Sequence, residues 1–154
     1  MTDAPRLLGD EDDAWRIISG RFGRIPDDRF EEPTLTPEGW SPKDLMFHVA
    51  GWMADCSLQL ERMREGSFDP TEETRETIER QNQVWFELSR VMGPADVRSR
   101  FASSRRRMID AFRAIGGAAG EPTPEAVEWF EESGALHYAK HDEDLRAYIE
   151  ATRA

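Results

Sequence analysis

The fold is decided by WSPKDLMFHVAGW, residues 40–52 of the 154-residue chain. Ser41 is placed to cap a helix, because its hydroxyl can accept from a free backbone N–H, and Pro42 at the first helical position sacrifices no hydrogen bond. The residues that follow are apolar on nearly every side of a helix, which is typical of a helix inside a bundle. His48 lies in their midst, and a buried imidazole needs a polar partner.

Composition limits what the protein can be. A chain of 154 residues predicts a single domain, residues 1–154, with a core of useful size. The net charge of −11 argues against a nucleic acid or an anionic membrane as the main partner. The single cysteine fits a reducing compartment, and the sequence shows neither a signal peptide nor an apolar run long enough to span a membrane. We therefore expect a soluble, cytoplasmic protein.

Apolar residues recur with the period of a helix rather than that of a strand. The predicted helices span residues 10–25, 42–64, 70–92, 95–115, 124–130 and 133–152, with a loop at 116–124. Gly93-Pro94 is either a kink in one long helix or a true turn, and Thr71 competes with Thr74 as a helix cap. The expected inward-facing residues include Trp15, Ile18 and Phe22 in the first helix, Val84, Trp85 and Leu88 in the third, and Leu136, Ala139, Leu145 and Tyr148 in the last. This pattern predicts an all-α bundle.

The three histidines are the main chemical candidates. His137 and His141 are four residues apart, so they project from one face of the last helix, a spacing with which two imidazoles can grip one metal ion. If His48 meets that face, three neutral nitrogen ligands would leave an open position on the metal, as in catalytic sites. The residues alone leave two alternatives: a core histidine bonded to a carbonyl, and a solvated pair on a charged helix.

Two motifs resemble those of the DinB/YfiT-like superfamily: WSPKDL followed by His48 and Trp52, and HYAKH at residues 137–141. The order of the helices is similar as well, so the resemblance covers nearly the whole chain. It implies a four-helix bundle of up-down-down-up type, commonly a homodimer, with a divalent metal held by His48, His137 and His141. The related mycothiol-dependent maleylpyruvate isomerases have a glutamate at one position of the last pair, so this chain resembles the three-histidine branch.

The resemblance implies functions of two classes. The first is a metal-dependent enzyme acting on a small molecule, either a hydrolase or an S-transferase that uses a low-molecular-weight thiol; Zn, Ni, Fe and Mn all accept imidazole ligands. The second is a non-catalytic, stress-associated bundle that binds a metal or a ligand. A cavity next to the metal would favour the enzyme. No residue stands out as a general base, so no catalytic residue is assigned.

Other residues near these motifs have simpler interpretations. Asp44 or Asp144 could fix the tautomer of a ligand, but we interpret them as a response to the helix dipole and as a solvated carboxylate. Trp52 and Tyr148 could line a pocket, although we expect Trp52 to lie in the core. We interpret Cys56 as a small buried hydrophobe rather than a nucleophile or a soft ligand.

One basic stretch departs from the acidic balance of the chain. It contains Arg98, Arg100, Arg105, Arg106, Arg107 and Arg113. These arginines would either steer an acidic substrate or the carboxylates of a thiol, or pair with the acidic excess elsewhere in the protein. We expect the second, because arginines spread around a helix usually form a solvated face.

Overall fold

The computed structural model describes residues 3–152, except for the side chains of residue 72 and residues 116–119. Within this part of the chain the regular elements are all helices, which confirms the predicted all-α class. They are α1 (Ala4–Gly23), η1 (Asp27–Arg29), α2 (Pro42–Glu65), η2 (Pro70–Glu72), α3 (Arg75–Val91), α4 (Pro94–Ala119), α5 (Pro124–Ser133) and α6 (Ala135–Ala151), where η marks a short 3-10 helix. None of the described helices is long and apolar enough to cross a membrane.

The helix α2 is the centre of the fold, and its predicted N-cap, Ser41, is present. Ser41 Oγ accepts from the backbone N–H of Asp44 at 3.1 Å, and the Asp44 carboxylate accepts from the N–H of Ser41 at 2.8 Å. Gly66 ends the helix at φ +82°, a left-handed conformation that glycine adopts without strain. Residues 41–51 are all buried, as their apolar pattern predicts.

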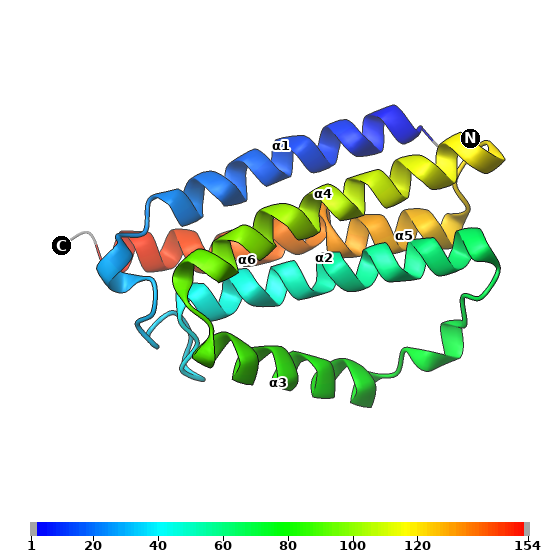
Figure 1. Cartoon of the computed structure of the whole chain (residues 1–154). Coiled ribbons are helices and arrows are strands. Elements are labelled where there is room, and N and C mark those ends of the chain that lie inside the picture. The colour runs from blue at the N-terminus through cyan, green and yellow to red at the C-terminus, as the bar shows by residue number, and fades with distance from the viewer. Residues whose placement is uncertain (1–2, 153–154) are drawn as a thin grey trace.

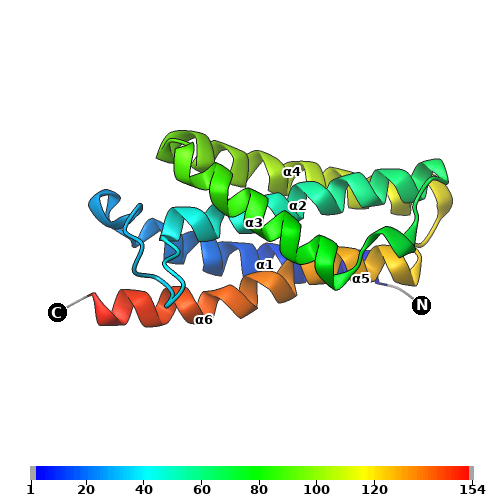
Figure 2. The ribbon, with the colours of Figure 1, turned by 90° about the horizontal axis from the view of Figure 1, so that it is seen from below.

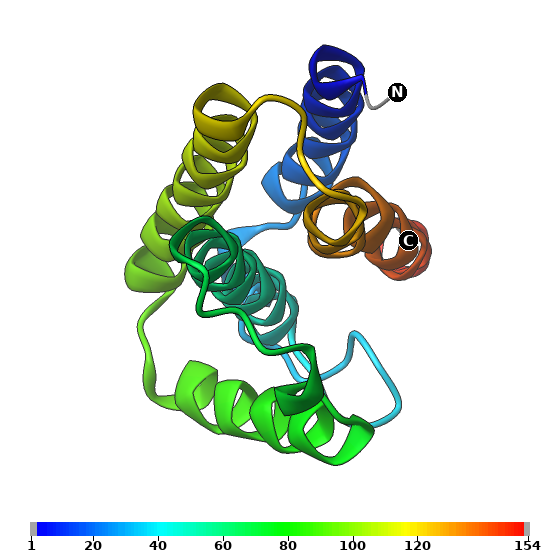
Figure 3. The same ribbon diagram turned by 90° about the vertical axis from the view of Figure 1, so that its right-hand side faces the viewer.

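The other helices are arranged around α2 (Figure 1). The most extensive helix packing is between α2 and α4. The helix α2 also packs against α3 and α5, whereas α1 packs against α6. Figure 3 shows α3 and α1 on opposite sides of α2. In Figures 1 and 2, α2 and α4 run in the same direction, while α1 and the rod formed by α5 and α6 run the opposite way. The residues Gly93-Pro94 form a true turn, because α3 ends at Val91 and α4 begins at Pro94.

Several predicted helix boundaries are wrong. The first helix begins at Ala4 rather than residue 10, because Asp3 caps it by accepting from the N–H of Arg6 at 3.0 Å. The acidic residues 10–13 therefore lie inside α1. The predicted loop at 116–124 is also too long, since α4 continues to Ala119. Of the two competing caps, Thr74 caps α3 and Thr71 lies in η2.

The inward face of α3 differs from the predicted one. Val84 and Leu88 are 43% and 45% exposed, whereas Ser89 is buried. Polar side chains on α3 reach partners on α2: Asn82 Oδ1 accepts from Trp52 Nε1 at 2.8 Å, and Ser89 Oγ donates to Asp44. A pattern of apolar residues cannot reveal a helix that docks through hydrogen bonds.

The inward face of α6 is also set by polar side chains. Leu136 is 51% exposed and Ala139 is exposed, contrary to prediction. Leu145 and Tyr148 are buried as predicted, and Tyr138 is buried as well. The histidines share this helix, so α6 presents aromatic and imidazole rings to the bundle where a simple apolar stripe was expected.

Candidate metal centre

The three histidines meet between α2 and α6. His48 comes from α2, and His137 and His141 come from successive turns of α6. His137 Nε2 lies 3.2 Å from His48 Nε2 and 3.0 Å from His141 Nε2. One nitrogen of each ring lies within 4.8 Å of the other two. The predicted convergence is confirmed, while binding of a metal stays a prediction.

The close contacts among the rings cannot all be hydrogen bonds. An imidazole nitrogen has one in-plane position, which carries either a proton or a lone pair. His137 Nε2 can therefore form a hydrogen bond with only one of its two neighbours, and its close contact with the other is unfavourable. Two nitrogens bound to one ion at about 2.0–2.1 Å, with an angle between about 90° and 109°, lie about 2.9–3.4 Å apart. The observed spacing and the all-imidazole donor set both fit a metal ion.

Burial keeps the three rings neutral. The pKa of His48 is lowered to about 3 and that of His137 to about 2, chiefly by desolvation and in smaller part by the charges of His141 and Lys140. The pKa of His141 is lowered by burial as well, although the carboxylate of Asp144 opposes this shift. The lone pairs that a metal requires are thus available at neutral pH without displacing protons.

The outer nitrogens of these rings lack hydrogen bonds within the described part of the chain. The Nδ1 atoms of His48, His137 and His141 are buried, and none has a partner there. The carboxylate of Asp144, 54% exposed, lies 3.6 Å from His141 Nδ1, which is too far for a hydrogen bond. Asp44 lies in the first turn of α2, where we expected it to respond to the helix dipole, and its carboxylate accepts from the N–H of Ser41 and from Ser89 Oγ rather than from a histidine. The carboxylates considered for orienting the ligands therefore do not hold them.

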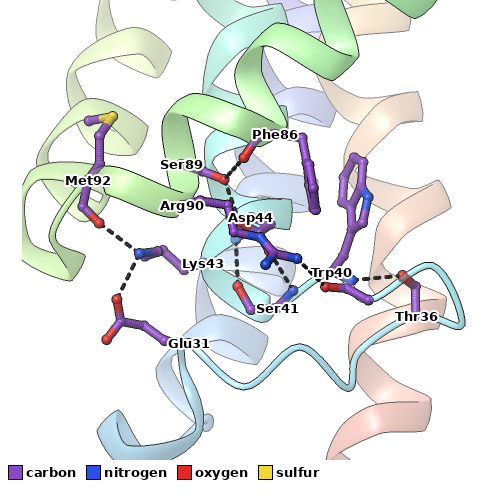
Figure 4. Close-up of polar contacts among 11 residues, drawn as sticks. Glu31, Thr36, Trp40, Ser41, Lys43, Asp44, Phe86, Ser89, Arg90 and Met92 are labelled. Atoms are coloured by element: carbon purple, nitrogen blue, oxygen red, sulfur yellow. Dashed lines mark hydrogen bonds and ion pairs between the residues drawn. The ribbon is translucent and has the colours of Figure 1, made fainter.

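Polar contacts fix the start of α2 and with it the position of His48 (Figure 4). Asp44 accepts from Ser89 Oγ, which ties α2 to α3. Lys43 Nζ donates to Glu31 and to the carbonyl of Met92, both at 2.7 Å. The connector before α2 ends in Trp40, whose ring stands edge-on to His48 with centroids 5.2 Å apart.

A pocket of about 630 Å³ adjoins His137. Its walls come from α2, the segment around η2, the start of α3, α5 and α6. The apolar lining consists of Trp52, Phe68, Pro70, Ile78 and Trp129. The polar lining consists of Glu73, Glu125, Glu128, Glu132, Ser133, His137 and Lys140. Trp52, expected in the core, is half-buried and lines this pocket, whereas Tyr148 is buried elsewhere and hydrogen-bonds to Glu32.

The remaining candidates serve the packing of the bundle. Cys56 is fully buried, burial raises the pKa of its thiol to about 12, and Sγ donates to the carbonyl of Trp129. This confirms its interpretation as a small core residue. The basic stretch pairs with acidic residues, as expected: Arg105 binds Glu11, and Arg107 binds Glu61. Among the described residues that line the pocket at His137 there is no arginine.

Sequence reasoning missed the α5 side of the pocket. Residues 124–130 were predicted only as a short helix, although Glu125, Glu128 and Glu132 are spaced by three and four residues and share one face. That spacing was the available signal. What the sequence could not reveal is which helix this face opposes, because α5 and η2 lie far apart in the chain.

Fold and site together define a class. An all-helical domain with three histidines gathered between its second and last helices is a DinB/YfiT-like domain, as the two sequence motifs indicated. The chain belongs to the mycothiol maleylpyruvate isomerase N-terminal domain family, whose model matches residues 12–137. The match includes His48 and ends at His137, so His141 lies just beyond it. No curated protein and no solved structure was found to match the chain.

Proposed function

We propose that the protein is a divalent-metal-dependent enzyme whose metal is held by His48, His137 and His141. The proposal rests on one observation: the Nε2 atoms of three neutral imidazole rings lie close together. His137 Nε2 has two close neighbours and can form a hydrogen bond with only one of them. A bound divalent ion would supply a Lewis acid that favours the deprotonated form of a hydroxyl or a thiol. Zn, Ni, Fe and Mn all suit imidazole ligands.

The reaction that we propose is hydrolysis, or transfer of a low-molecular-weight thiol to an electrophile. The family name supports the thiol, since it refers to mycothiol. The pocket next to His137 would receive the small-molecule substrate, with Trp52 and Trp129 holding its apolar part and excluding water. We do not carry the maleylpyruvate of that name over, because this dicarboxylate would meet the glutamates of α5.

The alternative function is a non-catalytic bundle that binds a metal or a small ligand. A module that holds only a metal needs no space for a second molecule next to it. The pocket of about 630 Å³ that reaches His137 therefore favours the enzyme over a module that holds a metal alone. Turnover of a generic electrophile with and without a small thiol separates the transferase, the hydrolase and the module.

We further propose that α1, α2, α4 and α6 form the up-down-down-up bundle implied by the superfamily, with α3 placed in the connection between α2 and α4. The directions of these helices in Figure 1 support this assignment. The homodimer that we propose would cover the exposed apolar residues of α3, of which Val91 is 82% exposed. Light scattering on the purified protein tests the dimer.

Metal content tests the central proposal. Untagged protein, stripped with a chelator and reloaded with Zn²⁺, is expected to retain about one equivalent after dialysis. His48→Gln, His137→Gln and His141→Gln should each retain less than about a tenth of that amount. Glu143→Gln, an exposed neighbour of His141 on α6, is the matched control and should load like the wild type. Wild-type protein that takes up no ion, or histidine variants that load normally, would contradict the proposal.

A further inference from the structure

The pocket beside His137 has an unbalanced charge. Among the described residues that line it, four glutamates stand against one cation, Lys140. Three of these glutamates, Glu125, Glu128 and Glu132, follow one face of α5. In the described part of the chain none of the three has an ion pair or a hydrogen bond. Their charges are therefore not neutralised by the protein.

Aromatic rings lie next to these carboxylates. Trp129 is on α5 itself and Trp52 is on α2, and both line the pocket. Phe68 stands edge-on to Trp129, with ring centroids 6.5 Å apart. The face of an aromatic ring carries partial negative charge and attracts ammonium groups, tryptophan most strongly. Carboxylates and indole rings around one space are the combination that recognises a cation with an apolar body.

The charge of the pocket also differs between its two ends. The glutamates are supplied by α5 and by the segment next to η2, whereas α6 supplies His137 and the cation Lys140. A divalent ion on the histidines would make that end more positive. A ligand complementary to both ends has a cationic group at α5 and an electron-rich group, such as a thiol, hydroxyl or carbonyl, at the histidines.

We propose that this pocket binds a cationic small molecule, with an ammonium group placed between the glutamates of α5 and the ring of Trp129 and an apolar body that extends toward His137. The pocket selects against dicarboxylates, because two more negative charges would be brought among the three unpaired glutamates of α5. The proposal rests on the proposed function only in calling this ligand a substrate, since the pocket and its charges exist without a metal.

Three probes of similar size and different charge test this selectivity on the metal-free protein. They are 2-phenylethylammonium, the neutral 2-phenylethanol and the anionic 3-phenylpropionate, each titrated at neutral pH and low ionic strength. The readout is the shift of the indole N–H signals of Trp52 and Trp129 in NMR spectra, with Trp15 on α1 as an internal reference. The ammonium probe is expected to bind at least about fivefold more tightly than the alcohol, and the carboxylate more weakly than both.

Variants of α5 locate the selectivity. The double substitution Glu128→Gln and Glu132→Gln should weaken binding of the ammonium probe about tenfold and leave the alcohol unchanged. Glu150→Gln, an exposed glutamate near the opposite end of α6, is the matched control and should have no effect. Equal binding of the ammonium and the alcohol, tighter binding of the carboxylate, no saturable shift with any probe, or a double variant that binds normally would each overturn the proposal.

The outcome is separable from that of the metal experiment. His137→Gln is expected to lose the metal and still bind the ammonium probe, because the ring of Trp129 and the glutamates of α5 stay in place. If the wild-type protein loads no metal yet binds the ammonium probe selectively, the proposed enzyme fails and the cation pocket stands. If it loads metal but binds all three probes alike, the proposed metal site stands and the cation pocket fails.

Discussion

Removal of Arg105 is expected to destabilise the bundle far more than removal of a neighbouring arginine. Glu11 is 0% exposed in the middle of α1, and its carboxylate accepts from Arg105 Nε and Nη2. Tyr138 on α6 donates to the same carboxylate at 3.0 Å. This cluster joins α1, α4 and α6, and it raises the pKa of Arg105 chiefly through the hydrogen bonds to Glu11.

The magnitude follows from the burial of Glu11. In Arg105→Met the apolar stem is kept and the cation is lost, so a fully buried carboxylate remains with Tyr138 as its main donor. Breaking a buried ion pair in this way costs about 3–5 kcal/mol, and the partial exposure of Arg105 places the expected loss at about 3 kcal/mol. The double variant Glu11→Gln, Arg105→Met removes both charges, and we expect it to recover most of that loss.

The assay is urea unfolding of the metal-free protein at pH 7, followed by circular dichroism. Arg107→Met is the matched control: this arginine lies two positions along α4 and pairs with Glu61, but both side chains are more than a third exposed, so its loss should cost less than about 1 kcal/mol. The reasoning is refuted if the two arginine variants lose equal stability, or if the losses at residues 11 and 105 simply add.

Two further predictions concern stability. Because burial lowers the histidine pKa values in the fold, to about 3 for His48 and about 2 for His137, the unfolded chain takes up protons first as the pH falls below about 6.5. The unfolding free energy of metal-free protein should therefore decline by about 1.4 kcal/mol per pH unit for each of these two histidines between pH 6 and 5; a wild-type profile no steeper than that of His48→Gln would contradict this. In Gly51→Ala the new Cβ would lie 2.5 Å from the Trp85 ring, so thermal unfolding should show a loss of about 1–3 kcal/mol. Gly20→Ala in α1, where nothing lies within 4 Å, should be neutral or stabilising, and equal effects at the two glycines would exclude the steric cause.

The sequence was most informative where a local rule acts alone. The cap formed by Ser41 and Asp44, the stop at Gly66 and the burial of residues 41–51 follow from short-range chemistry, and the structure has all of them. The spacing of His137 and His141 likewise fixes one helical face. Bringing His48 to that face required knowledge of which helices are neighbours, and this came from the resemblance to a known superfamily rather than from any residue by itself.

The sequence was misleading where a polar residue is buried. Glu11 lies at the predicted start of the first helix, residues 10–25, yet it is buried in the core, where Arg105, distant in the chain, neutralises it. Asn82 and Ser89 face inward on α3 and leave Val84 and Leu88 exposed, because hydrogen bonds to α2 decide the docking of that helix. Partners of this kind are set by tertiary structure, so hydrophobic periodicity assigns such positions to the wrong face.

The two buried polar clusters on α6 differ in a way that bears on function. Tyr138 belongs to a cluster that the protein completes by itself, since Glu11, Arg105 and the phenol satisfy one another. The adjacent residue, His137, belongs to a cluster that the described chain leaves incomplete: two Nε2 neighbours compete for one position, and three buried Nδ1 atoms have no partner. Buried polar groups are costly unless they are paired. A bundle that satisfies one cluster completely and leaves the next one incomplete beside a pocket supports the proposal that the second cluster takes its missing partner, an ion, from outside.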